Sequence, residues 1–345
     1  MTVLTATTGV RGGVSVAGWG IALPERRVTN EDLAARLDTS DAWIVERSGI
    51  RERRWAGPGE TTGPLALAAT RRALERAGRS ADQVDIIAVA TTTPERPIPS
   101  TAALVAAGLG TDAGALDLNA ACAGFVYGLT AVSALLQAGV ARTAVLVGAD
   151  TMTSVVDPDD RATAVLFGDG AGAVVLTGDA GGPGDPGAPG LVASDLVNDP
   201  DGVGLLVVPA GGSAQPASAA TVAAGQHYLQ MDGREVFRRA VRAVERSILR
   251  ALDRAGVGPD DIALFVPHQA NARIVDAVLS RTGLDPTRTS GSVERYGNTS
   301  AASIPLALAE AADAGALHEG DLVLLCGFGA GLTVGTALWR WGRPA

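Results

Sequence analysis

The segments RALERAGRSADQVDIIAVA (residues 72–90) and RALDRAGVGPDDIALFVPH (residues 250–268) are two versions of one pattern. Each predicts an amphipathic helix that ends at a glycine, then an Asp-rich turn and a short apolar strand. The second version begins 178 residues after the first, and at the same spacing AVLVGAD (144–150) matches LVLLCGF (322–328). Two matches in register predict a chain built from two duplicated halves.

A stretch rich in Gly, Pro and Asp, GDAGGPGDPGAPG (178–190), separates these halves. Its composition is typical of a surface connection, so we expect one half in residues 1–180 and the other in residues 190–345. A second loose stretch, 209–226, is expected to be an insertion in the second half. Apolar strands alternate with helices, which predicts an α/β fold whose sheets are covered on both faces.

The composition narrows the class of protein. Apolar residues make up 47% of the 345 residues and aromatic residues only 4%, which indicates a large core of Ala, Val, Leu and Gly. The formal net charge of −9 disfavours non-specific binding to nucleic acid. All 28 basic residues are arginines. The absence of lysine excludes Schiff-base lysine chemistry and a Walker P-loop.

The cysteines and the N-terminus carry further expectations. Cys122 and Cys326 lie far apart without a CxxC partner, so we expect neither a disulfide framework nor a thiolate metal site. The N-terminus lacks the pattern of a signal peptide, and no apolar run approaches the roughly 20 residues of a membrane span. We therefore expect a cytoplasmic protein without a membrane segment.

Cys122 lies among small residues in LDLNAACAGF (116–125), between an apolar strand and a helix. The repeat spacing pairs it with Ser300 and places Cys122 and Asn298 near the starts of equivalent helices. Pseudo-twofold packing would bring these helix starts together, and the positive end of a helix would lower the pKa of the thiol. From the residues alone, Cys122 is either such a nucleophile or a buried packing residue.

Three histidines are candidate bases. His318 lies in a polar turn and His227 follows the loose insertion, whereas His268 ends the buried strand of IALFVPHQAN, where a side chain can reach a cleft. The glycines of FGAGLTVG (328–335) permit close approach of backbone N–H groups to a ligand, or simply a turn between strands. FGDGAGAVVL (167–176) leads into a strand rather than a helix, so we interpret it as structural.

Six segments together resemble the β-ketoacyl-acyl carrier protein synthase III family, whose members are thiolase-fold condensing enzymes. They are TSDAWIVERSGIRERR (39–54), NAACAGF (119–125), DRATAVLFGDGAGAVVL (160–176), VPHQANARI (266–274), YGNTSAASIPLAL (296–308) and GFGAGLTVG (327–335). They follow the family order over nearly the whole chain. The resemblance implies a duplicated five-layer αβαβα sandwich, in agreement with the internal repeat.

The resemblance also implies a mechanism. Cys122 would take an acyl primer from acyl-CoA, and His268 and Asn298 would bind the thioester carbonyl of malonyl-acyl carrier protein during decarboxylation. The backbone N–H groups of Cys122 and Ala330 would form the oxyanion hole, although the family usually has Gly at the second position. No metal, flavin or nicotinamide cofactor is expected. Asn298 in place of a second histidine or cysteine favours an initiating enzyme over elongating synthases and thiolases.

Further binding roles come only from the resemblance. Trp43 and Arg161 would enclose the adenine of CoA, with Arg47 and Asn271 along the channel. The acidic carrier protein would dock at two arginines, Arg238 and Arg273. The acyl pocket would be lined by Ile98, Met152, Phe167, Leu229 and Phe328. Some relatives place an aromatic residue from the partner of a homodimer at the position of Ile98, so an aliphatic residue favours a branched or longer primer.

Other functions remain open at this point. One is a specialised relative that makes a polyketide or quinolone starter or transfers acyl groups to an alcohol; the pair His268 and Asn298 favours carbon–carbon condensation instead. A cysteine hydrolase also uses Cys, His and Asn, but papain-like proteases carry Trp beside their cysteine. The third is an acyl-binding module without catalysis, which a Cys122→Ala variant would distinguish.

Overall fold

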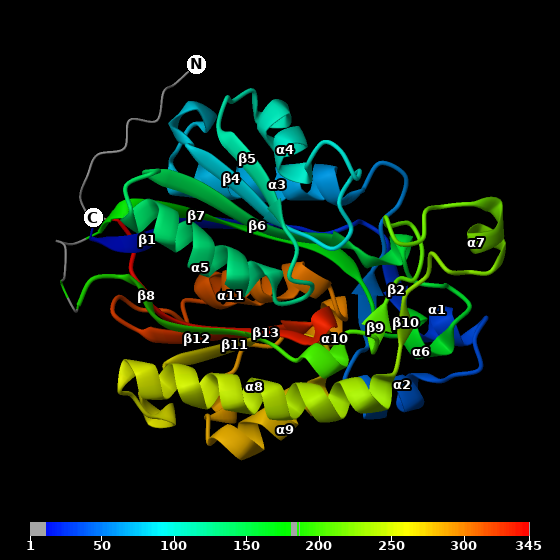
Figure 1. Ribbon diagram of the computed structural model, residues 1–345. Coiled ribbons are helices and arrows are strands. Elements are labelled where there is room, and N and C mark those ends of the chain that lie inside the picture. Colours follow the sequence, from blue (N-terminus) through cyan, green and yellow to red (C-terminus); the bar gives the residue numbers. More distant parts are fainter. Residues whose placement is uncertain (1–11, 181–184, 186, 345) are drawn as a thin grey trace.

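The computed structural model describes residues 12–180, 185 and 187–344. Two β-sheets are stacked between three layers of helices (Figure 1). One outer layer holds α3 (Thr62–Ala77) and α4 (Thr101–Leu109), the middle layer α5 (Gly124–Gln137) and α11 (Ser303–Asp313), and the other outer layer α8 (Gly233–Ala255) and α9 (Ala272–Thr282). The expected αβαβα sandwich is confirmed.

The two sheets share one strand order. The first sheet runs β1-β7-β6-β4-β5 and the second, taken from its β8 edge, runs β8-β13-β12-β11. The strands of the first are β1 (Gly13–Ala22), β7 (Asp169–Ala180), β6 (Thr143–Thr151), β4 (Ile86–Ala90) and β5 (Gly114–Leu118). Those of the second are β8 (Gly190–Asn198), β13 (Thr333–Arg340), β12 (Leu322–Gly329) and β11 (Leu264–Pro267). In each sheet two antiparallel pairings are followed by a parallel one.

The fifth position distinguishes the two sheets. In the first sheet β5 pairs in parallel with β4 over five residues, from Gly114 to Leu118. In the second sheet the corresponding place holds only an isolated bridge between Phe265 and Thr289. The duplication is therefore complete for four strands and reduced for the fifth.

The repeated segments of the sequence form the same local structure twice. α3 ends at Gly78 and α8 at Gly256, with φ values of 60° and 67°, a left-handed conformation in which glycine is favoured. A 3-10 turn follows each helix, at Ala81–Gln83 and Pro259–Asp261, and leads directly into β4 or β11. Local signals along the chain thus produce the helix, the turn and the strand in both halves.

The halves share one hydrophobic core. The buried cluster around the middle helices contains Phe125 of α5 and Ile304 of α11, together with Leu146 from the first sheet and Leu325 from the second. The expected division into residues 1–180 and 190–345 stays a prediction, because residues 181–184 and 186 of the proposed linker lie outside the described residues.

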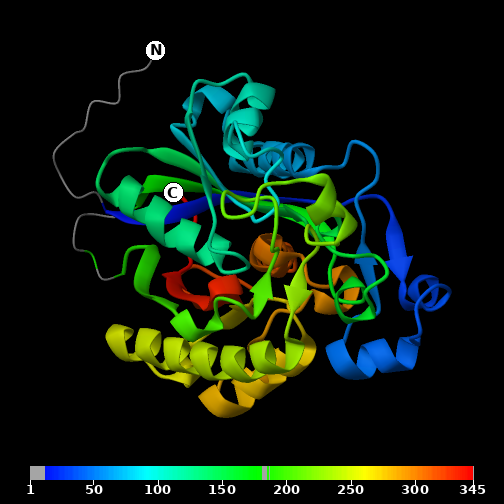
Figure 2. The same ribbon diagram turned by 45° about the vertical axis from the view of Figure 1, so that its right-hand side comes forward.

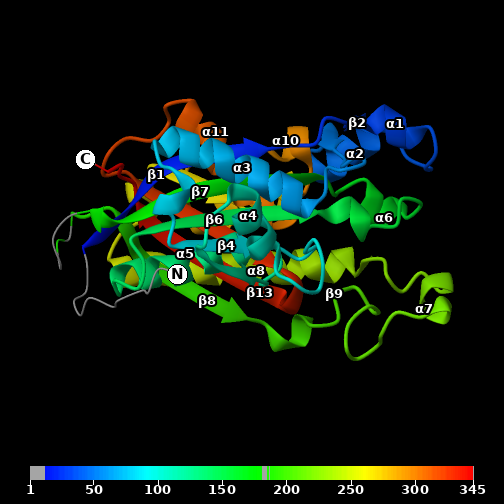
Figure 3. The same ribbon diagram turned by 90° about the horizontal axis from the view of Figure 1, so that it is seen from above.

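Smaller elements gather at one end of the sandwich (Figures 2 and 3). They are β2 (Arg27–Thr29), α1 (Asn30–Ala34), α2 (Asp41–Ser48), β3 (Glu52–Arg54), α6 (Arg161–Ala164), β9 (Leu206–Val207), α7 (Ala219–Ala223), β10 (Gln230–Met231) and α10 (Val293–Tyr296). α7 lies within the stretch expected to be an insertion. In residues 12–180, 185 and 187–344, no helix combines the length and apolar character needed to cross a membrane.

Candidate active site

Two turns of the same geometry precede the middle helices. Asn119 Oδ1 accepts the N–H of Ala121 at 3.1 Å, and Asn298 Oδ1 accepts the N–H of Ser300 at 2.9 Å. Ala121 and Ser300 have φ values of 47° and 51°, a region that costs a non-glycine residue energy and is concentrated at functional sites. The two turns therefore align Ala121 with Ser300.

This alignment corrects the pairing of Cys122 with Ser300. α5 begins at Gly124 and α11 at Ser303, so Cys122 corresponds to Ala301. The fixed repeat spacing fails here because the second half carries one additional residue before its turn. Ser300 nevertheless meets the cysteine across the two halves, since Cys122 Sγ donates a hydrogen bond to Ser300 Oγ at 3.3 Å.

The environment of Cys122 raises the pKa of its thiol. Only 6% of the residue is exposed, and burial raises the thiol pKa to about 12. The hydrogen bond with Ser300 opposes this shift, and the charge of Asp150 adds to it. The expectation of a lowered pKa is therefore wrong: loss of hydration is the largest influence on the thiol pKa, although helix α5 begins only two residues later.

His268 follows the last residue of β11, as expected for a side chain delivered by a strand end. Its backbone N–H bonds Cys326 O at 2.7 Å, its Nδ1 lies 2.6 Å from Ser303 Oγ, and Phe328 packs edge-on against the ring. The residue is 2% exposed, and burial lowers its pKa to about 3. The imidazole is therefore neutral at neutral pH.

Asn298 is held by its own turn and by a bridge to Phe167. Its N–H bonds Leu166 O at 2.8 Å, and its carbonyl accepts the N–H of Gly168 at 3.0 Å. Because the side-chain oxygen accepts the Ser300 N–H, the amide nitrogen is the atom left to donate. No described protein group is hydrogen-bonded to that nitrogen.

Cys122, His268 and Asn298 line one cavity of about 170 Å³. Two of the five predicted acyl-pocket residues, Phe167 and Phe328, also line it. Met152 and Leu229 lie instead in or against the neighbouring apolar cluster, and Ile98 is 85% exposed on the surface. The structure therefore does not bring Ile98 to the cavity of its own chain.

Eight apolar side chains in the wall of this cavity lie outside the candidates that the sequence singled out. They are Leu166, Leu206, Met231, Val236, Phe237, Ala270, Ile274 and Leu332. Val236 and Phe237 lie in the first turn of α8, three and four residues after Gly233, which also lines the cavity. This helical spacing marks one face of α8, but the sequence does not show what that face covers.

A second cavity, of about 450 Å³, adjoins the first and shares Leu166, Gly233, Phe237 and Asn271 with it. Trp43 and Arg47 line its outer part, and Asn271 Nδ2 donates to Arg47 O at 3.0 Å. The larger cavity thus lies directly beside the cavity that holds Cys122.

Arg161 reaches the same place without lining the cavity. Its guanidinium lies 5.0 Å from the centre of the Trp43 ring, and that of Arg47 lies 4.8 Å from it. Arg161 also donates to Asp38 O at 2.7 Å. A planar ring can enter between Trp43 and Arg161 only if the arginine swings away, since the two are already in contact.

Gly329 brings the end of β12 against the cysteine. A Cβ atom at Gly329 would lie 2.5 Å from Cys122 N. Ala330 begins the 3-10 turn Ala330–Leu332 between β12 and β13, so its N–H has no acceptor inside that turn. FGAGLTVG is therefore a turn between strands, and its residue Gly329 lies directly against the backbone of Cys122.

Comparison with known proteins connects this geometry to a family. Models of 3-oxoacyl-[acyl-carrier-protein] synthase III and of its C-terminal part match residues 116–199 and 252–341. The β-ketoacyl-[acyl-carrier-protein] synthase III of Roseiflexus sp. (strain RS-1) is 49% identical over 328 residues, covering 95% of this chain and 98% of that protein. The chain belongs to the β-ketoacyl-acyl carrier protein synthase III family.

Solved structures of synthase III relatives agree. The synthase III of Thermus thermophilus is 46% identical and superposes with a TM-score of 0.86, covering 96% of this chain and all of that one. The priming β-ketosynthase of the R1128 polyketide biosynthetic pathway is 37% identical with a TM-score of 0.87, covering 98% and 99%. The predicted resemblance and the thiolase-like fold of this condensing-enzyme family are confirmed.

The predicted docking arginines of this synthase III chain differ in surroundings. Arg238 is paired with Glu235, and Arg239 also bonds Glu235. Arg273 lies at the larger cavity, where the sequence analysis missed a further cation, Arg234. Arg234 follows Gly233 at the start of α8, and no motif marked it.

The remaining candidates lie elsewhere. His227 Nε2 is 2.9 Å from Thr221 Oγ1, and His318 lies beside Asp321. In the described part of the chain, no group of three or more His, Cys, Asp or Glu side chains is placed to hold a metal ion.

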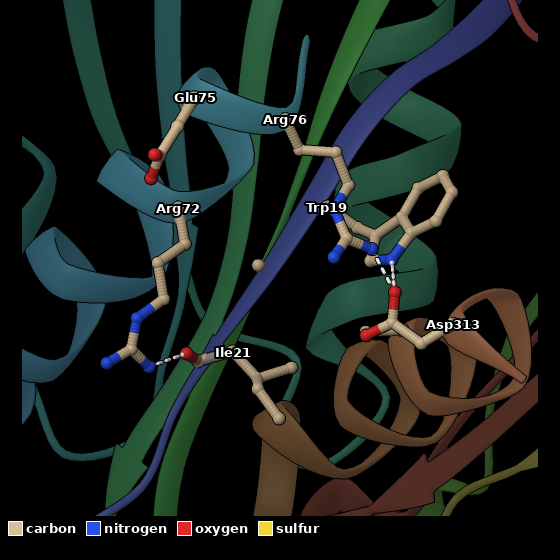
Figure 4. A pocket seen from close by; sticks show the side chains of 8 residues that line it. Trp19, Ile21, Arg72, Glu75, Arg76 and Asp313 are labelled. Carbon is tan, nitrogen blue, oxygen red and sulfur yellow. Dashed lines mark hydrogen bonds and ion pairs between the residues drawn. The ribbon is translucent and has the colours of Figure 1, made fainter.

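A third cavity, of about 310 Å³, lies beside β1, α3 and α11, and Cys122, His268 and Asn298 do not line it (Figure 4). Arg76 pairs with Asp313, whose carboxylate also accepts the indole N–H of Trp19 at 2.9 Å, and Arg72 donates to Ile21 O. The arginines thus bind acceptors of the protein itself, and this cavity is not the candidate active site.

Proposed function

We propose that the protein condenses an acyl-CoA primer with malonyl-acyl carrier protein, with loss of carbon dioxide, and so starts fatty acid synthesis. The observation that carries the proposal is the shared cavity of Cys122, His268 and Asn298. Its two polar donors and its single nucleophile match the two steps of such a condensation.

In the first step, Cys122 Sγ attacks the thioester carbonyl of acyl-CoA. A new carbon–sulfur bond forms, the bond to the CoA sulfur breaks, and the thiol proton ends on the departing CoA. Negative charge on the acyl oxygen is offset by the N–H groups of Cys122 and Ala330; a single donor of this kind contributes roughly 10²–10³-fold in rate. In the resting protein the thiol donates to Ser300 Oγ; once the thiol proton has left, the Ser300 hydroxyl can turn and donate to the charged sulfur.

In the second step, the carbon–carbon bond to the malonyl carboxylate breaks and its electron pair moves into a thioester enolate. His268 Nε2–H and Asn298 Nδ2–H donate to the enolate oxygen, and the carbanion then attacks the acyl group on Cys122. The cysteine sulfur leaves as thiolate and regains a proton from water. Because the carboxylate supplies the electron pair, the cycle needs neither a redox cofactor nor a metal.

The larger cavity beside that of Cys122 supports acyl-CoA as the first substrate. The adenine would stack on Trp43 with Arg161, and the pantetheine arm would pass Arg47 and Asn271. Carrier proteins are acidic, so Arg234 and Arg273 at the larger cavity offer local positive charge despite the net charge of −9. These substrates place the reaction in the cytoplasm.

We also infer a homodimer. Ile98 is 85% exposed, and Leu116 is exposed on β5, the open edge of the first sheet. An unpartnered strand edge beside apolar side chains is suited to pairing with a second copy. Association through this edge would bring Ile98 of one protomer toward the acyl pocket of its partner.

A second pathway uses the same chemistry. The likeness to a priming β-ketosynthase of polyketide synthesis favours a polyketide starter as the alternative product. The two differ in the primer that is loaded and in the carrier protein, while the roles of Cys122, His268 and Asn298 are the same.

The test uses the full chain with acetyl-, isobutyryl- and hexanoyl-CoA. Intact mass identifies the acyl group that loads, and adding malonyl-acyl carrier protein should release carbon dioxide and give the β-ketoacyl product. Cys122→Ala should abolish loading and condensation, and Cys326→Ala is the matched control that retains both. Loading without any condensation would refute the proposal, as would undiminished condensation by Cys122→Ala.

A further inference from the structure

Two serines near the start of α11 contact the candidate catalytic residues Cys122 and His268, one serine each. Cys122 Sγ donates to Ser300 Oγ at 3.3 Å, and Ser303 Oγ lies 2.6 Å from His268 Nδ1. Both serines are almost completely buried, at 1% and 0% exposure. One helix start therefore supplies a separate hydroxyl group to the nucleophile and to the histidine.

The hydroxyl hydrogen of Ser303 has one acceptor. The backbone N–H of Gln269 points to Ser303 Oγ at 3.4 Å, so the oxygen already accepts on one side. Buried serines in other helices donate to the carbonyl four residues earlier, as Ser133 does to Leu129 O at 2.6 Å. Ser303 makes no such bond within the described residues, which leaves His268 Nδ1 as its acceptor.

A donor at Nδ1 determines where the ring proton lies. A neutral imidazole carries one proton, and a nitrogen that accepts a hydrogen bond is the unprotonated one. The proton of His268 is then on Nε2. Nε2 has no hydrogen-bond partner among the described residues, and His268 lines the cavity that also holds Cys122 and Asn298.

We propose that Ser303 is a positioning residue that holds His268 in its Nε2–H tautomer, so that the histidine donates to the enolate oxygen in the decarboxylation step. The role of the enolate rests on the proposed function, whereas the tautomer is a property of the resting protein. Ser303 touches no substrate and acts only through His268.

Loss of the hydroxyl group should separate the two half-reactions. Without Ser303 as donor, the Nδ1–H tautomer becomes accessible and presents the lone pair of Nε2 to the enolate oxygen. Carbon dioxide release should fall roughly 10–100-fold, the range of one lost oxyanion donor or somewhat less. Loading of Cys122 should stay within about twofold, because its hydroxyl contact comes from Ser300.

The experiment compares the full-length wild type with Ser303→Ala, with Ser300→Ala, and with Ser133→Ala as a buried-serine control. Acyl loading is measured by intact mass without malonyl substrate, and carbon dioxide release from malonyl-acyl carrier protein is measured separately. ¹⁵N spectra of histidine-labelled protein report the protonated ring nitrogen, with His268 assigned from a His268→Gln variant. Ser303→Ala should slow decarboxylation, Ser300→Ala should slow loading, and Ser133→Ala should change neither.

The wild-type spectrum alone can overturn the proposal, even if Ser303→Ala fails to fold. A resonance showing His268 protonated at Nδ1 would contradict the assigned tautomer. Equal loss of loading and decarboxylation in a folded Ser303→Ala protein would reduce Ser303 to a structural role. A wild type that neither loads nor decarboxylates refutes the proposed function instead, and the ¹⁵N measurement still tests the tautomer.

Discussion

Replacing Asp150 by asparagine should weaken the fold and, at the same time, make the thiol of Cys122 easier to ionise. Asp150 is fully buried, and one carboxylate oxygen accepts five hydrogen bonds of 2.7–3.0 Å from the N–H and hydroxyl groups of Thr91, Thr92 and Thr93. The other oxygen accepts the N–H of Ala301 at 3.0 Å. One buried carboxylate thus joins the end of β4 to the start of the α11 region.

The structure sets the size of the stability change. Asparagine can keep its oxygen toward the threonines, but its NH₂ group then faces the Ala301 N–H. One bond is lost, and two buried donor groups, the NH₂ and the Ala301 N–H, are left unpaired. This costs about 2–4 kcal/mol in the free energy of unfolding. For a chain of 345 residues the melting temperature should fall by roughly 3–6 °C.

The effect on the thiol has the opposite sense. The charge of Asp150 helps to raise the thiol pKa of Cys122, so removing the charge lowers that pKa. Each unit of pKa changes the thiolate fraction tenfold at fixed pH, and we expect iodoacetamide to label Cys122 about two- to tenfold faster. Mass spectrometry of the labelled peptides at pH 8 measures the rate.

Cys326 is an internal control within the same chain. It is 2% exposed, and burial raises its thiol pKa to about 12 with an added contribution from Asp195 rather than Asp150. General loosening of the fold by Asp150→Asn would accelerate the labelling of both cysteines. The reasoning is refuted if the labelling ratio of Cys122 to Cys326 does not rise, and the reciprocal Asp195→Asn variant should favour Cys326.

Three further predictions address other parts of the site. Burial lowers the pKa of His268 to about 3, so between pH 6.5 and 3 the unfolded chain binds a proton at this residue and the folded chain does not. The unfolding free energy of the wild type, minus that of His268→Gln, should therefore fall by up to about 1.4 kcal/mol for each pH unit from 6.5 toward 3. A difference that stays constant with pH would contradict this. Gly329→Ala should reduce acyl loading at least 100-fold, because its Cβ would lie 2.5 Å from Cys122 N, whereas Gly204→Ala, which meets nothing within 4 Å, should load normally in the same mass assay. Arg161→Ala should raise the KM for acyl-CoA by roughly 2–30-fold with kcat unchanged in steady-state assays; an unchanged KM would remove the proposed stacking role.

The layered fold was predictable because its signals are local. Gly78 and Gly256 end two helices, and the apolar strands after them must be buried, so two copies of one pattern indicated two equivalent sheets. The order of motifs likewise indicated that Cys122, His268 and Asn298 belong to one site, and the structure places them around one cavity.

The thiol pKa and the pocket walls were not predictable from the sequence in the same way. The pKa of Cys122 depends on the balance between burial, a hydroxyl contact and the charge of Asp150, and only three-dimensional packing decides that balance. Met231 and Val236 reach the cavity through the placement of β10 and α8, which no motif records. The contact of Arg161 with Trp43 depends on a side-chain rotamer, and the sequence does not determine that rotamer.

The unequal fifth position of the two sheets gives the molecule edges of different kinds. The first sheet has a full strand there, β5, while the matching place in the second sheet is reduced to the bridge between Phe265 and Thr289. A strand that pairs antiparallel with its own copy uses up that edge on both molecules, because such a contact is two-fold symmetric. In the proposed homodimer, pairing through β5 would therefore close on itself, at a place where the second half offers only a single bridge.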